Sequence, residues 1–101
     1  MEAELAKLAA VESRLRALIQ ALVQRHAARG EPLSWRLMFE IEDEAMTLLA
    51  GDAGLDAHYV RMFRVPPAPP ERRREEPVGI ADAGAMHTVL WMIQEAYFHR
   101  H

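Results

Sequence analysis

Cysteine is missing from this 101-residue chain. Its absence excludes disulfides, thiolate zinc sites, iron–sulfur clusters and cysteine nucleophiles. Asparagine is missing as well, and the aliphatic hydroxyls are limited to four residues: Ser13, Ser34, Thr47 and Thr88. Hydroxyl-based covalent catalysis therefore has few groups to use. No phosphate-binding loop, dinucleotide fingerprint or catalytic-triad spacing is present either, so we expect no enzymatic activity and no cofactor.

A strong excess of charge of one sign is also absent. Twelve basic residues stand against fifteen acidic ones, for a formal net charge of -3. Nucleic-acid binding depends on clustered lysine and arginine, so we expect no nucleic-acid partner.

Long apolar runs are absent too. No stretch approaches the ~18 to 20 apolar residues of a membrane span. The first residues, with Glu2, Glu4 and Lys7 in an amphipathic pattern, lack the basic segment and the apolar run of a secretory signal. We expect a cytoplasmic protein with no membrane partner.

What is present is a globular composition with strong helical patterning. Half of the residues are apolar and about a quarter are charged, and the length suits one domain covering 1–101.

Apolar residues recur at steps of three and four over 5–26, which predicts a long amphipathic helix that ends near Gly30 and Pro32. Ser34 and Gly51 bound a second predicted helix over 35–50. The short link between the two predicts an antiparallel hairpin.

The segment 55–65 is ambiguous between helix and strand. Asp56 is a suitable helix N-cap, whereas Tyr59, Arg61, Phe63 and Val65 alternate as a strand would. Because no second strand is available to pair with it, we expect a short helix.

Proline and charge dominate 66–77. Five prolines and six charged residues fall in these twelve positions, which predicts an extended linker on the surface. A proline-rich ligand motif is the alternative, because the prolines also fit the PxxP spacing.

The last predicted helix, from near Asp82 to about His99, is unusually apolar. Met86, Val89, Leu90, Ile93 and Tyr97 form its core stripe. His87, Trp91 and Phe98 widen the apolar arc beyond half of the circumference. Such a helix is central in a bundle or is shared with another chain, so we predict a homodimer with His87, Trp91 and Phe98 at its interface.

Glu42 is the most informative single residue. On a helical wheel it points out of an apolar arc of the 35–50 helix, where an unpaired buried carboxylate is costly. One interpretation pairs Glu42 internally with His26, which lies on the core face of the first helix. The other places Glu42 on a protein-binding face with three apolar neighbours, Trp35, Phe39 and Met46.

A catalytic or metal site would need the histidines to converge. Such a site would gather Glu42, His26, His58 and His87 in one cavity. Glu95 and His99 have the i, i+4 spacing of two metal ligands, with His101 close behind. A chain end is a poor scaffold for fixed coordination, so we expect no metal.

Together these patterns predict an all-α fold, a small helical bundle. The predicted function is a non-enzymatic module that binds and masks a protein partner, in the manner of a bacterial immunity protein or antitoxin. The alternative is a small-ligand or metal-dependent helical enzyme that uses Glu42 and histidines in a bundle cavity.

Overall fold

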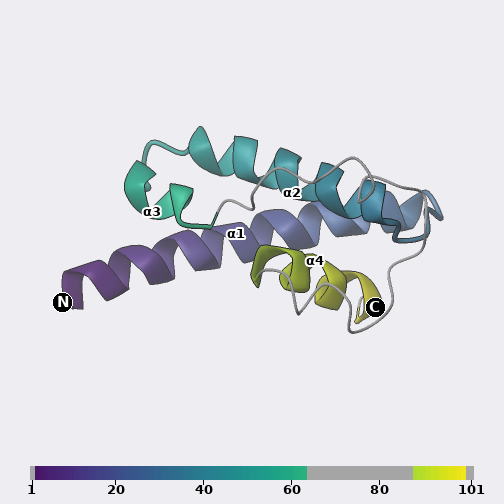
Figure 1. Ribbon diagram of the computed structural model, residues 1–101, viewed down its shortest axis with the longest axis horizontal. Helices are drawn as coiled ribbons and strands as arrows, with labels where there is room; N and C mark the ends of the chain where they lie inside the picture. The colour runs from purple at the N-terminus through teal and green to yellow at the C-terminus, as the bar shows by residue number, and fades with distance from the viewer. Residues whose placement is uncertain (1, 64–87, 100–101) are drawn as a thin grey trace.

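The described part of the chain has an all-α fold, as the sequence predicts. A computed structural model describes residues 2–63 and 88–99. Its helices are α1 (Glu2–Ala28), α2 (Trp35–Ala50), α3 (Ala57–Arg61) and α4 (Thr88–Phe98) (Figure 1). The predicted linker over 66–77 and the predicted helix start near Asp82 lie outside the described residues, and so does His87. None of the described helices is both long enough and apolar enough to cross a membrane.

The hairpin of α1 and α2 follows from local signals in the turn between them. Gly30 has a φ of +75°, in the left-handed region that glycine adopts without strain. Its N–H donates to the carbonyl of Ala27 at 3.0 Å, which closes the end of α1. The Ser34 hydroxyl then accepts from the Leu37 N–H at 3.0 Å, so the N-cap of α2 is the predicted one.

The core lies where the three longer helices meet. Helix α4 packs against both α1 and α2, and α1 and α2 pack along each other (Figure 1). The largest fully buried side chains come from all three helices, and burial of each apolar one is worth about 1.5–3 kcal/mol. They are Val11, Leu15, Ile19, Leu22, Leu37, Met38, Ile41, Met46, Leu49, Leu90, Ile93 and Gln94.

Helix α3 confirms the choice of helix in the ambiguous segment. Asp56 caps it by accepting the His58 N–H at 2.9 Å. Val60 is its buried residue, and α3 contacts both α1 and α2. An ion pair between Lys7 Nζ and Asp56 Oδ2, at 3.5 Å, joins α1 to this cap.

Candidate functional site on the outer face of α4

The face of α2 that the sequence suggested for partner binding is turned inward. Trp35, Phe39, Glu42 and Met46 are all buried, with between 1% and 7% of each residue exposed. The reason is that α1, α3 and α4 all contact α2, so its apolar arc serves the core of this chain. Trp35 and Phe39 stack on each other at a centroid distance of 6.5 Å inside that core. The expectation that these four residues form an exposed surface is therefore not met.

The proposed pairing of His26 with Glu42 is replaced by a different pair. His26 Nδ1 lies 3.1 Å from Glu31 Oε1, in the turn that follows α1. Arg29 Nη1 approaches the same Glu31 oxygen at 3.8 Å. The contact between His26 and Glu31 thus links the end of α1 to the connection that leads to α2. Sequence spacing suggested that the partner of His26 is Glu42, on the other helix of the hairpin. The acidic residue that contacts His26 is instead Glu31, five residues further along the chain.

The residues proposed for a catalytic cavity do not converge within the described structure. His26 lies beside the start of α2, whereas His58 belongs to α3, beyond the end of α2. Helix α2 has 16 residues, so these two ends are separated by about 24 Å. His58 is exposed and lies edge-on to Tyr59 at 5.2 Å. Within residues 2–63 and 88–99, no group of three or more His, Cys, Asp or Glu side chains is arranged so that it could hold a metal ion.

Helix α4 has one face in the core and another in solvent. Its buried residues are Val89, Leu90, Met92, Ile93, Gln94 and Tyr97. Trp91 and Phe98, two of the residues predicted for an oligomer interface, remain 43% and 41% exposed. The Phe98 ring lies edge-on to the buried Tyr97 at 6.3 Å, which helps to fix its position. The outer face of α4 therefore presents two large aromatic side chains to solvent.

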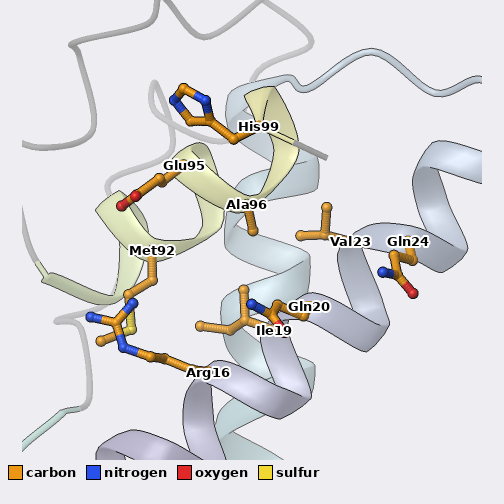
Figure 2. Close-up of a pocket in the computed structure, with 9 residues that line it drawn as sticks. All are labelled: Arg16, Ile19, Gln20, Val23, Gln24, Met92, Glu95, Ala96 and His99. Carbon is orange, nitrogen blue, oxygen red and sulfur yellow. The ribbon is translucent and has the colours of Figure 1, made fainter. Parts of the chain in front are cut away.

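A groove of about 410 Å³ runs beside this face, between α1 and α4. Figure 2 shows that Ile19 and Val23 from α1 and Met92 and Ala96 from α4 are the apolar side chains that line it. The polar lining consists of Arg16, Gln20 and Gln24 on α1, and Glu95 and His99 at the end of α4. The groove thus combines apolar walls with side chains that donate and accept hydrogen bonds.

A smaller hollow of about 200 Å³ adjoins the two aromatic residues. Trp91, Gln94, Glu95, Phe98 and His99 line it. Glu95 and His99 also line the groove, so the hollow adjoins the groove at these two residues. We call Trp91, Glu95, Phe98 and His99, together with the groove, the α4 surface.

The charges around the α4 surface are mixed in sign. Arg16 Nη2 pairs with Glu12 one turn earlier on α1, at 3.1 Å. Glu95 supplies a carboxylate on the opposite side of the groove. The surface therefore has no excess of one charge that would draw a strongly acidic or strongly basic ligand.

Sequence reasoning found the aromatic part of the α4 surface and missed the groove. Trp91 and Phe98 stood out because the apolar arc of the last helix was too wide for its neighbours. Arg16, Gln20 and Gln24 form a polar stripe at steps of four along α1, but which helix lies beside that stripe depends on the tertiary packing.

No family model matches this chain, and neither a curated protein nor a solved structure matches it.

Proposed function

We propose that this protein is a non-enzymatic helical module that binds another protein through the α4 surface. The observation that carries this proposal is the exposure of Trp91 and Phe98 on a helix whose opposite face belongs to the core. Large aromatic residues are enriched at protein interfaces, where their burial supplies much of the binding free energy.

The surroundings of the two aromatic residues suit the same role. Protein interfaces combine an apolar centre with a polar rim that forms hydrogen bonds. Here Trp91 and Phe98 would form the centre, and Glu95, His99 and Gln24 would lie at the rim. Because α4 is anchored by six buried residues, the helix that carries the surface is already in place before a partner binds, which lowers the entropic cost of binding.

The enzyme alternative depended on a polar cavity at Glu42. The groove between α1 and α4 is large enough for a small molecule. However, neither Glu42 nor His26 nor His58 is among its lining residues. A protein partner remains the better supported class of ligand.

Two narrower expectations stay as predictions within this proposal. The masking role of an immunity protein or antitoxin was inferred from the face of α2, and that face is buried. The α4 surface is a different surface and gives this narrower role no support. A cytoplasmic setting is compatible with a chain that contains no cysteine to form disulfides.

Site-specific photo-crosslinking in the cell of origin tests the proposal. A photoreactive phenylalanine analogue at position 98 samples the α4 surface, and the same analogue at position 48 is the control. Leu48 is 50% exposed and belongs to α2.

The proposal predicts a crosslinked protein of defined mass from position 98 that is lost when Trp91→Asp is added. Position 48 should not give the same product. An absence of any discrete product at position 98, or one product shared by both positions, would overturn the assignment.

A further inference from the structure

Glu95 differs from most acidic side chains of the described structure in having no basic partner. The acidic residues that form ion pairs, at distances of 2.6–3.8 Å, are Glu12, Glu31, Glu40, Glu44, Asp52 and Asp56. Glu95 is exposed, and within residues 2–63 and 88–99 it forms no such pair. Its carboxylate is therefore available to a cation on another molecule.

The position of Glu95 in α4 makes an unpaired carboxylate unfavourable. Glu95 lies in the last turn of α4, and this turn contains no basic residue. The aligned peptide dipoles give the C-terminal end of a helix a partial negative charge, which stabilises cations and opposes anions. Arg16 and His99 line the groove with Glu95, but Arg16 pairs with Glu12, and no ion pair joins His99 to Glu95 in the described part of the chain. A cation from a partner would offset both negative charges.

Two exposed aromatic residues flank this carboxylate. Trp91 is four positions before Glu95 and Phe98 is three positions after it, the spacings at which side chains on a helix are neighbours. All three line the hollow of about 200 Å³. Sites for small molecules typically have volumes of about 300–1,000 Å³. The hollow is below that range, so its size suits a single side chain of a protein partner.

We propose that the α4 surface binds an arginine side chain of the partner protein, whose guanidinium stacks on Trp91 and donates hydrogen bonds to the Glu95 carboxylate. This inference rests on the proposed function, because it names the chemistry of the partner at the same surface. Arginine suits the site better than lysine, since a planar guanidinium both stacks on an aromatic ring and donates two hydrogen bonds to one carboxylate. Because the charges around the α4 surface are mixed in sign, the arginine should stand among apolar residues rather than in a basic run.

Peptide display on the full chain tests this chemistry. A library of random short peptides is bound to the wild-type chain, and peptides that also bind Trp91→Asp are removed, so that ligands of the α4 surface remain. We expect the recovered peptides to carry an arginine beside apolar residues. Replacing that arginine by citrulline, which has nearly the same shape without the charge, should weaken binding at least about tenfold. Replacement by lysine should also weaken binding, because an ammonium group lacks the planar pair of donors.

Glu95→Gln supplies the complementary change on the protein. It removes the charge and keeps the shape of the side chain, so it should weaken the arginine peptide by about the same factor as citrulline does. The citrulline peptide should bind Glu95→Gln and the wild type almost equally, because the two changes remove the same interaction. Isothermal titration calorimetry measures these affinities.

Glu4→Gln is the matched control. Glu4 is also exposed and forms no ion pair within residues 2–63 and 88–99, but it lies in the first turn of α1. This substitution makes the same change in net charge and should leave the affinity of both peptides unchanged. Circular dichroism of each variant establishes that it is folded.

Three results would overturn the inference. They are a library that yields no peptide specific for the α4 surface, recovered peptides without arginine, and an arginine peptide that binds Glu95→Gln as tightly as the wild type.

The photo-crosslinking experiment separates this inference from the proposed function. Adding Glu95→Gln to the chain with the photoreactive analogue at position 98 should reduce the yield of crosslinked protein. An unchanged yield leaves the proposed function standing and overturns the arginine contact. A product made only of two copies of this chain overturns it as well, because a second copy would then occupy the surface. The absence of any discrete product overturns the proposed function, and this inference with it.

Discussion

Trp91 and Ile93 are two residues apart on α4 and have opposite environments: Trp91 is 43% exposed, whereas Ile93 is completely buried. Their separation of about 200° around the helix explains the difference, because α1 and α2 cover the side that carries Ile93. The contrast divides α4 into a part that packs in the core and a part that faces solvent.

Substitutions at these two positions should therefore have different effects. Ile93→Ala leaves a cavity in the core and should lower the free energy of unfolding by about 2–5 kcal/mol. Trp91→Ala should cost clearly less, because much of the side chain already contacts water. Urea denaturation of both variants measures this difference, and equal losses would contradict the division of α4 into two faces.

The N-cap of α2 gives a second stability prediction. Ser34 is 4% exposed, and its hydroxyl accepts the Leu37 N–H. Ser34→Ala leaves that donor without its side-chain acceptor and should destabilise the protein by about 1 kcal/mol. Ser34→Thr keeps an acceptor and should lose less. If thermal unfolding showed the two variants to be equally stable, the cap would not be the source of the effect.

The bounds of α2 were the most predictable part of the fold, and the reason is local. Ser34 and Gly51 carry start and stop signals that operate within one turn of the helix, and the structure confirms both. Helix α1 extends beyond the predicted 5–26 to Glu2–Ala28. The added residues are alanine and glutamate, which favour helix without adding to the apolar stripe on which the prediction relied.

The environment of α2 could not be predicted in the same way. A helical wheel shows that Phe39 and Glu42 share an arc, but it does not show how many neighbouring helices cover that arc. For α4 the pattern itself was more informative, because its apolar arc exceeded what a small bundle can bury. The exposure of Trp91 and Phe98 agrees with that reasoning.

The pair of His26 and Glu31 should be energetically coupled. The two side chains are 3.1 Å apart and partly buried, so a double-mutant cycle with alanine at both positions should give a coupling energy of roughly 0.5–1 kcal/mol. The corresponding cycle for His26 and Glu42 should give close to zero. A larger coupling in the second cycle would restore the pairing across the hairpin.

Stability at low pH should depend on Asp56. The His58 N–H that it accepts lowers the pKa of its carboxyl from the ordinary 3.8, and the ion pair with Lys7 lowers that pKa further. A carboxyl with a lower pKa in the folded state stabilises the fold above its unfolded pKa, and this stabilisation is lost as the pH falls through the folded pKa.

Asp56→Asn keeps a hydrogen-bond acceptor at the cap but removes this titration. The variant should therefore lose less stability than the wild type as the pH falls from about 4 to 2. Urea midpoints measured across that interval provide the comparison. Identical pH profiles for the two proteins would show that Asp56 does not contribute.

The most direct test of the predicted homodimer, with Trp91 and Phe98 at its interface, is the molar mass of the full chain in solution as a function of concentration. Sedimentation equilibrium from ~1 to ~300 μM spans the dissociation constants expected of a small interface. The average mass should rise from the monomer value of 11.5 kDa toward twice that value. Phe98→Glu should keep it at the monomer value, and the matched surface change Leu48→Glu should not. A wild-type mass that stays at 11.5 kDa throughout, or an equal effect of the two substitutions, would contradict the predicted homodimer.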